Sequence, residues 1–330
     1  MSPDTLSQVL SSLNQHLDLE QSYGFESMDD CCIYTLNNGK KIIQSVDFFT
    51  PIVDNPYDFG RIAAANSLSD IYAMGGAPLF ALNILAFPSD DLPNNVMEDI
   101  LRGGIDTAKE AGIPILGGHS IKDKEPKYGL VVTGEPSKDG IIIKNSNAKV
   151  GDHLKLTKPI GTGIITTAIK KEIASKEQLN QAVSIMTELN SKAASLMLDF
   201  KVSACTDVTG YGLLGHLSEM CLGSNVSASI NFDNITFLSG VFEFAQKGII
   251  PGGSKRNLEY INDKIQFHNN IADFQKLMLA DAQTSGGLLI ALPYKNSEKL
   301  IKELENEKCL TSQIIGKIVD KKSKYLIEIK

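Results

Sequence analysis

The first part of the chain alternates between strand-like and helix-like patterns of hydrophobic residues. A helical pattern near the start (TLSQVLSSLNQHL) precedes two apolar runs, CCIYTL and KIIQSV, and the NNGK between them is typical of a hairpin turn. The next segment, DFFTPIVDNPYDFG, is rich in Asp, Pro and Gly and predicts a loop. From about Asp58 to Met74 the apolar spacing becomes helical, and Gly75 and Gly76 are expected to end that helix.

Further strands and one helix complete the first half. LFALNILAF (79–87) predicts a buried strand, a helix is expected over about 92–111, and IPILGGHS predicts a short strand running into a glycine-rich turn. KYGLVVTGE alternates as a strand does. The segment 136–152 has a loop-like composition, so we place a domain boundary there, between domains 1–150 and 151–330.

The second half mixes strands and helices in an irregular order. HLKLTKPIGTGIITTAI and VSACTDVTGYGLLGHLSEM each predict a strand, a loop and a helix, and a long helix is expected over 176–199. The polar stretch 251–270 predicts irregular structure, and QIIGKIV and YLIEI predict C-terminal strands. Because strands and helices do not alternate regularly, the expected fold class is α+β rather than a doubly wound sheet.

Composition narrows the class of protein. A length of 330 residues exceeds what one compact core usually serves, which favours two domains. The net charge of −7 argues against nucleic acid or an anionic membrane as the main partner. The N-terminus lacks the pattern of a signal peptide, and no apolar run reaches the length of a membrane span. Five scattered cysteines without a C-x-x-C spacing fit a reducing cytoplasm, where we expect the protein to be.

Acidic residues supply the first chemical signal. Asn66 and Asp70 are one helical turn apart, so they share a face of the 58–74 helix, and a solvated stripe is the simpler interpretation. Other acids stand at the ends of predicted elements: Asp29 and Asp30 before CCIYTL, Asp47 directly after KIIQSV, and Asp207 at the end of VSACTD. Converging carboxylates repel each other unless cations separate them. Mg²⁺, which prefers oxygen ligands and phosphate, is the expected cation.

Glycine-rich turns are the second signal. LGGHS (116–120) and PIGTG (159–163) follow strands, and such turns can direct backbone N–H groups at phosphate. Neither matches a Walker or dinucleotide fingerprint, so an ordinary tight turn remains the alternative for both. QTSGG (283–287) is interpreted as a structural turn that enters a strand. His216 is interpreted as a core histidine, and the adjacent Cys31 and Cys32 as small buried hydrophobic residues.

Longer motifs occur in an order known from one family. They are VDFFTPIVDNPYDFGRIAAANSLSDIYAMGG, LGGHSIKDKEPKYGLVVTG, LTKPIGTGIITTA, TDVTGYGLLGHLSEM, PGGSKRN and DAQTSGGLL. From about residue 2 to its C-terminus the chain resembles selenophosphate synthetase (selenide, water dikinase), of the aminoimidazole-ribonucleotide-synthetase-like superfamily. The resemblance implies a two-domain α+β fold, with an N-terminal sheet that forms a homodimer and a C-terminal α/β sandwich.

The resemblance also implies an activity and a set of site residues. The activity is that of a kinase that uses ATP to phosphorylate selenide to selenophosphate, releasing AMP and phosphate, for selenocysteine and selenouridine synthesis. Mg²⁺ would neutralise the triphosphate during phosphoryl transfer. The implied metal-binding residues are Asp30, Asp70 and Asp207, with Asn66 as a supporting residue. The implied nucleotide-binding residues are Ser27, Met28, Asp29, Asp47, Asp70, Gly118, His119 and Ser120, the last three reaching nucleotide across the dimer interface.

The start of the chain departs from the family pattern. The family carries Cys or selenocysteine, then Gly, any residue and Lys, shortly before a Ser-Pro-like start. Here Ser2-Pro3 is preceded only by Met1. We therefore assign no catalytic residue in this chain, expect the Cys or selenocysteine and the Lys upstream of Met1, and expect the chain as written to be inactive. The alternatives are another ATP enzyme of the superfamily and a catalytically dead nucleotide-binding paralogue.

Overall fold

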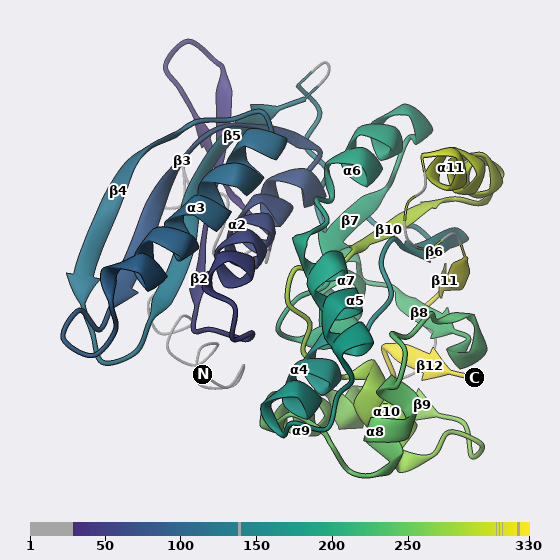
Figure 1. The fold of residues 1–330 in the computed structure, drawn as a ribbon. Helices are drawn as coiled ribbons and strands as arrows, with labels where there is room; N and C mark the ends of the chain where they lie inside the picture. The colour runs from purple at the N-terminus through teal and green to yellow at the C-terminus, as the bar shows by residue number, and fades with distance from the viewer. Residues whose placement is uncertain (1–28, 138–139, 308, 310, 312, 322–323) are drawn as a thin grey trace, which may run out of the picture.

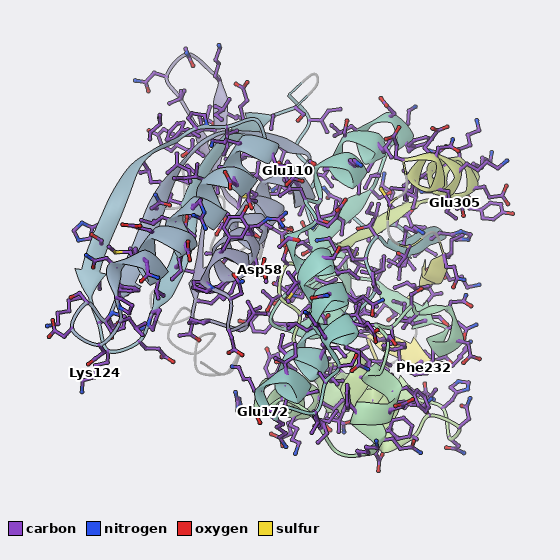
Figure 2. The ribbon with its side chains drawn as sticks, viewed as in Figure 1. Asp58, Glu110, Lys124, Glu172, Phe232 and Glu305 are labelled. Atoms are coloured by element: carbon purple, nitrogen blue, oxygen red, sulfur yellow. The ribbon has the colours of Figure 1, made fainter. Side chains whose placement is uncertain are left out.

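The computed structural model describes residues 29–137, 140–307, 309, 311, 313–321 and 324–330 (Figure 1). The helix predicted near the N-terminus, together with Ser27 and Met28, lies outside these residues. Charged side chains such as Lys124, Glu172 and Glu305 project from the outer surface (Figure 2). Within the described part of the chain, no helix is both long enough and apolar enough to cross a bilayer.

The described part of the first half forms one sheet with two helices on it. Its strand order is β1-β2-β5-β3-β4, antiparallel except for the parallel pair β3 and β4. The elements are β1 (Cys32–Thr35), β2 (Lys41–Phe49), α2 (Pro56–Ala73), β3 (Gly76–Phe87), α3 (Asn94–Glu110), β4 (Ile115–Lys122) and β5 (Lys127–Pro136). The predicted hairpin is confirmed as β1 and β2.

Helix α2 lies between this sheet and the second half of the molecule (Figure 1). Its start is fixed by Pro56 in the first turn and by the side chain of Asn55, which accepts a hydrogen bond from the backbone N–H of Asp58 at 3.0 Å. Its end is fixed by Gly75, whose φ of +67° favours glycine. Because α2 is covered on both sides, Asn66 is buried, and the interpretation of a solvated stripe is wrong.

The second half is built on a larger mixed sheet with strand order β7-β10-β6-β11-β8-β12-β9. Its strands are β6 (Asp152–Leu156), β7 (Ala204–Asp207), β8 (Ser227–Ile230), β9 (Ile265–Phe267), β10 (Leu288–Pro293), β11 (Ile314–Val319) and β12 (Ile327–Ile329). Its helices are α4 (Thr162–Lys170), α5 (Lys176–Thr187), α6 (Ser191–Met197), α7 (Gly212–Ser224), α8 (Val241–Gln246), α9 (Gly252–Ile261), α10 (Asp273–Leu279) and α11 (Tyr294–Asn306), with short 3₁₀ turns η3 (Leu198–Phe200), η4 (Phe232–Asn234) and η5 (Asn262–Lys264).

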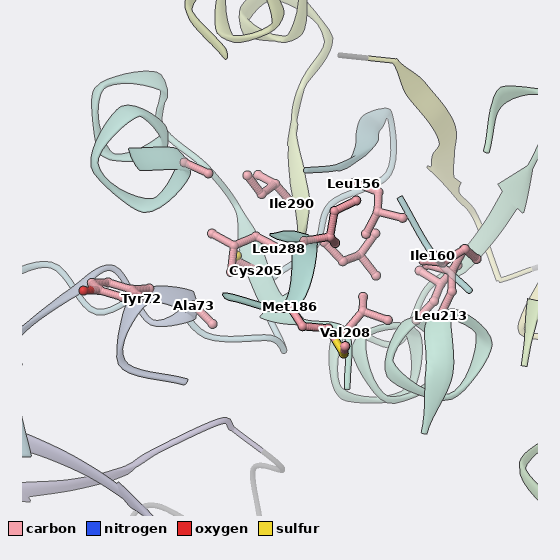
Figure 3. Close-up of a cluster of buried hydrophobic side chains, with 14 of the residues drawn as sticks. Tyr72, Ala73, Leu156, Ile160, Met186, Cys205, Val208, Leu213, Leu288 and Ile290 are labelled. Carbon is pink, nitrogen blue, oxygen red and sulfur yellow. The ribbon is translucent and has the colours of Figure 1, made fainter. Parts of the chain in front are cut away.

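One hydrophobic core connects the two halves. Figure 3 shows Tyr72 and Ala73, from the end of α2, in the same buried cluster as Cys205 of β7 and Leu288 of β10. The end of α2 is therefore anchored against the second sheet, which fixes the position of the polar residues one turn earlier in the helix. The fold is α+β, as predicted.

Three predictions for the first half are wrong in detail. The predicted glycine turn after residue 115 is part of strand β4, which pairs with β3. A Cβ on Gly118 would lie 2.2 Å from the carbonyl oxygen of Asn83, so this glycine permits close strand approach rather than a turn. Residues 47–49, predicted to belong to a loop, extend β2, because their backbone pairs with β5. Strand β3, predicted to be buried, exposes Leu79 and Leu82.

Two predictions for the second half also need correction. The stretch predicted to be irregular contains helix α9, whose buried face carries Ser254 and Asn257 beside Ile261, so its hydrophobic pattern is weak. The single helix predicted over 176–199 is divided into α5 and α6, because the backbone at Glu188 is extended.

Candidate metal and nucleotide site

Three aspartates from distant parts of the chain meet between the two sheets. Asp30 directly precedes the hairpin, Asp70 lies in the last turn of α2, and Asp207 ends β7. One carboxylate oxygen of each lies within 4.8 Å of the others. These are the three aspartates that the family resemblance implies as metal ligands, and they come from both halves of the fold.

Protein donors satisfy only part of this cluster. Asp30 Oδ1 accepts a hydrogen bond from Thr206 Oγ1 at 2.7 Å, and Asp70 Oδ2 accepts one from Ser45 Oγ. The Oδ2 atoms of Asp30 and Asp207 are buried and have no hydrogen-bond partner among the described residues. Buried polar atoms are normally paired, so two unpaired carboxylate oxygens on residues of one acidic cluster indicate the place of a cation.

The pKa shifts of the three aspartates also indicate a cation site. Burial raises the pKa of Asp30 and of Asp70 well above the usual range, and repulsion from Asp207 raises both further. Burial raises the pKa of Asp207 to about 6. Without a cation the carboxylates therefore favour protonation, and a divalent ion would reverse that preference. Oxygen-only donors suit a hard cation such as Mg²⁺ rather than a soft metal.

A fourth acid, Asp47, adjoins this cluster. It lies on the face of β2 that packs against α2, and Asn66 Nδ2 donates a hydrogen bond to its Oδ2 at 2.8 Å. Burial first and Asp207 second raise the pKa of Asp47 to about 7, while the bond from Asn66 lowers it in part. The other end of the same amide is also engaged, because Asn66 Oδ1 accepts the backbone N–H of Ser285 at 2.8 Å. Asn66 thus fixes Asp47 and ties it to the second half.

Sequence reasoning missed a buried lysine at this site. Lys158 Nζ donates hydrogen bonds to the carbonyl oxygens of Glu188 at 2.6 Å and Ser285 at 2.8 Å. Burial lowers the pKa of Lys158 to about 7, and Glu188 and Asp207 offset part of that effect. The available signal was the Lys-Pro pair between a strand and a glycine loop.

The other predicted nucleotide-binding residues that the structure describes are Asp29 and the run 118–120. The carboxylate of Asp29 accepts the backbone N–H of Asn145 at 3.3 Å and lies 3.6 Å from the ammonium group of Lys144, so it faces the segment that joins the two halves. The run 118–120 lies on the exposed edge strand β4, separated from β2 by β5 and β3. The structure does not bring this run to the acids of the same chain.

The PIGTG turn has its backbone donors occupied by protein. Gln283 Oε1 accepts the N–H groups of Gly161 at 2.9 Å and Thr162 at 3.1 Å. Asp281 Oδ2 accepts the N–H of Ile164 at 3.1 Å. The ordinary structural turn is therefore the better interpretation of this motif.

His216 is buried, and its Nε2 accepts the backbone N–H of Thr209 at 3.2 Å, which confirms the prediction of a core histidine. Cys31 is buried as predicted, whereas Cys32 is exposed, so the prediction for that residue is wrong. Burial raises the pKa of the Cys31 thiol well above its usual value, and Asp70 adds to this effect. A thiol held protonated in this way is a poor nucleophile.

Comparison with known proteins first defines the class. Residues 28–135 match the N-terminal domain of AIR synthase related proteins, and residues 149–328 match the C-terminal domain. The fold is shared with the HypE–HypF complex (TM-score 0.72, 19% identity, 98% of this chain and 96% of that chain). It is also shared with AaThiL solved with AMPPCP and TMP (TM-score 0.70, 15% identity, 99% and 93%) and with HypE solved with ATP (TM-score 0.64, 16% identity, 84% and 77%). The protein is thus a two-domain member of the AIR synthase related class.

Relatives in sequence identify the family. Proteins called selenide, water dikinase match from Carboxydothermus hydrogenoformans (47% identity over 328 residues, 99% of this chain and 94% of the relative) and from Myxococcus xanthus (48% over 304 residues, 91% and 85%). One from Clostridium botulinum is 45% identical over 325 residues, 98% of this chain and 93% of the relative. The chain belongs to the selenide, water dikinase family and is a phosphotransferase of that family.

Proposed function

We propose that this enzyme uses ATP to convert selenide to selenophosphate in the cytoplasm, with AMP and phosphate as co-products, for selenocysteine and selenouridine synthesis. The observation that carries the nucleotide part is the set of three aspartates with two unpaired buried oxygens. Family membership supports the choice of selenide, and structural neighbours solved with ATP or AMPPCP support a nucleotide site in this fold.

In this proposal Asp30, Asp70 and Asp207 hold Mg²⁺, which when bound supplies charge neutralisation for the triphosphate. The protein's own contribution is to fix the ligands in place. Ser45 orients the carboxylate of Asp70, and Thr206 orients that of Asp30.

The nucleotide contacts are assigned as further parts of this proposal. Asn66 holds the carboxylate of Asp47 at the edge of the cluster. We assign residues 27–29 and Asp47 to nucleotide binding, within a domain 1–150 that binds ATP and forms the dimer, and residues 151–330 to the second domain.

The proposed homodimer is supported by the face of the first sheet that no helix of the described chain covers. Val46 and Leu82 both pair with Val131, so the three side chains form one row on the face away from α2. Val46 is 54% exposed, and Leu116 on the adjacent β4 is 65% exposed. An apolar sheet face of this kind is typical of an interface between copies. In this proposal residues 118–120 of β4 contact the nucleotide of the second copy. Light scattering tests this, with a dimer expected at micromolar concentration and a monomer expected for Val46→Glu.

The reaction is tested by coupling AMP release to selenide. The assay uses the chain extended at its N-terminus by the family's Cys-Gly-x-Lys segment and detects selenophosphate by ³¹P NMR. We expect AMP and selenophosphate only when ATP, Mg²⁺ and selenide are all present. Nucleotide binding without any turnover would favour the catalytically dead paralogue, and ADP release without a need for selenide would favour another ATP enzyme of the superfamily.

A further inference from the structure

Ser285 differs from the other residues that adopt a left-handed backbone. Four non-glycine residues of the described chain have positive φ, namely Glu172, Lys201, Asn225 and Ser285. The first three are exposed and follow helices, where such a conformation is an ordinary way to end a helix. Ser285, with φ of +48°, is 1% exposed and lies in a turn before a strand. Strain of this kind at a buried non-glycine position is typical of functional sites.

The surrounding structure holds the Ser285 backbone from several sides. Its N–H donates to Asn66 of α2, and its carbonyl accepts from Lys158. The next carbonyl, that of Gly286, accepts Asn190 Nδ2 at 2.8 Å. A Cβ on Gly286 would lie 2.0 Å from the carbonyl oxygen of Val208, so the turn is pressed against the residue that follows Asp207. The turn is therefore fixed to both halves of the fold and packs against the residue that follows Asp207.

The hydroxyl of Ser285 makes no hydrogen bond within the described part of the protein. Its Oγ is buried without a hydrogen-bond partner, a property it shares with the Oδ2 atoms of Asp30 and Asp207. Carboxylates can bind a cation but offer a phosphate group no donor, and two of the three N–H groups of the Lys158 ammonium are directed at carbonyls. The hydroxyl of Ser285 is a further donor at this place, and one that no described protein group uses.

We propose that Ser285 Oγ donates a hydrogen bond to a phosphate oxygen of the nucleotide held at the acidic cluster. The left-handed backbone of the turn sets the position of that hydroxyl, and Asn66 and Lys158 hold the backbone in place. This inference rests on the proposed nucleotide site and adds a residue to it. It also changes the sequence-based interpretation of QTSGG from a purely structural turn to one that contacts ligand.

The test uses two variants at Ser285 and one matched control. Ser285→Ala removes the hydroxyl and keeps the strain, whereas Ser285→Gly removes both. Glu172→Gly relieves the same backbone conformation at an exposed position in the second half (Figure 2). Each protein is measured without ligand by thermal unfolding, and with Mg²⁺ and AMPPCP by calorimetry.

We expect both Ser285 variants to bind Mg²⁺–AMPPCP about tenfold more weakly while their ligand-free Tm is equal or higher, with Gly above Ala. Glu172→Gly is expected to raise Tm without changing affinity. If wild type binds AMPPCP and both Ser285 variants bind it within about twofold, the inference fails while the proposed function stands. A lower ligand-free Tm in both variants would assign the hydroxyl a structural role and also overturn the inference. If wild type itself does not bind, the proposed function fails first.

Discussion

Two buried aspartates on adjacent segments have opposite surroundings. Asp281 is 0% exposed and Asp207 is 1% exposed, and burial raises the pKa of both, to about 7 and about 6. Asp281 Oδ1 accepts Ser254 Oγ at 2.8 Å, and its Oδ2 accepts the N–H of Ile164 at 3.1 Å and Gln283 Nε2 at 3.0 Å. Asp207 Oδ2 has no partner in the described chain.

The number of hydrogen-bond partners distinguishes a structural aspartate, Asp281, from a proposed metal ligand, Asp207. A buried carboxylate whose oxygens are all paired joins elements of the fold, and Asp281 joins the start of α4 to α9 in this way. A buried carboxylate with an unpaired oxygen, beside others like it, is incomplete without a cation. Burial and a raised pKa are common to Asp281 and Asp207 and do not distinguish them. The hydrogen-bond partners of their carboxylate oxygens do.

The largest expected effect is on nucleotide affinity. Asp30→Asn, Asp70→Asn and Asp207→Asn should each weaken binding of Mg²⁺–AMPPCP at least about 100-fold, or ~2.7 kcal/mol, because each removes a charged metal ligand. Asp281→Asn should leave the affinity within about twofold. Calorimetry in the presence of Mg²⁺ measures all four. Unchanged affinity in the first three would remove the metal-site assignment.

The same substitutions should change stability in opposite directions. Without metal, Asp70→Asn should raise the free energy of unfolding by about 1 kcal/mol, because it relieves repulsion within the cluster. Asp281→Asn should lower the free energy of unfolding by about 2 kcal/mol. The new NH₂ group would replace an oxygen that accepts hydrogen bonds, so it would face donors without an acceptor. Urea unfolding in EDTA gives both values. Changes of the same sign would mean that the two aspartates do not differ as described.

Two asparagines, Asn66 at the acidic cluster and Asn234 away from it, extend this comparison between functional and structural polar residues. Asn66→Ala should weaken Mg²⁺–AMPPCP binding about tenfold, or ~1.4 kcal/mol, since Asp47 and the Ser285 turn both lose an anchor. Asn234→Ala is the matched control, because Asn234 Nδ2 donates at 3.0 Å to the carbonyl of Ile314, at β11 of the second sheet. That control should lose stability and keep its affinity. Equal affinities for the two variants would contradict the role given to Asn66.

The smallest expected effect concerns pH. The pKa of Asp207 is raised to about 6 and that of Asp47 to about 7, so the native state keeps protons that the unfolded state has released above pH 4. Metal-free stability contributed by these groups therefore falls as pH rises from about 4 to 7. Mg²⁺ competes with those protons, so the increase in Tm on adding Mg²⁺ should grow from pH 5 to pH 8. Thermal unfolding with Mg²⁺ and with EDTA measures it, and a pH-independent increase would argue against Mg²⁺ at these carboxylates.

Most of the proposed metal-binding residues could be predicted from the sequence, because each stands out against the residues next to it in the chain. Asn66 and Asp70 stand out inside an apolar helical run, and Asp30 and Asp207 border strands, so their placement followed from the elements and from the family resemblance. Pairing across the sheet was harder to predict. The sequence predicts a turn at Gly118 of β4, because the close approach that requires this glycine comes from Asn83 on the neighbouring strand.

Residues defined by distant partners could not be predicted. Lys158 and Ser285 are 127 positions apart in the sequence. Their roles depend on the hydrogen bond from the ammonium group of Lys158 to the carbonyl oxygen of Ser285, which no local sequence pattern indicates. Helix α9 was missed for a related reason. Its buried face carries Ser254 and Asn257, which bond to Asp281 and to backbone carbonyls, so it lacks the apolar stripe on which helix prediction depends.

The central claim is that the unpaired oxygens of Asp30 and Asp207 mark a divalent-cation site. Titration of the metal-free protein with Mn²⁺, followed by the EPR signal of the free ion, tests this without nucleotide or turnover. The account predicts saturable loss of the free-ion signal with wild type and with Asp281→Asn, and little or no loss with Asp207→Asn. Equal Mn²⁺ binding by wild type and Asp207→Asn would contradict it.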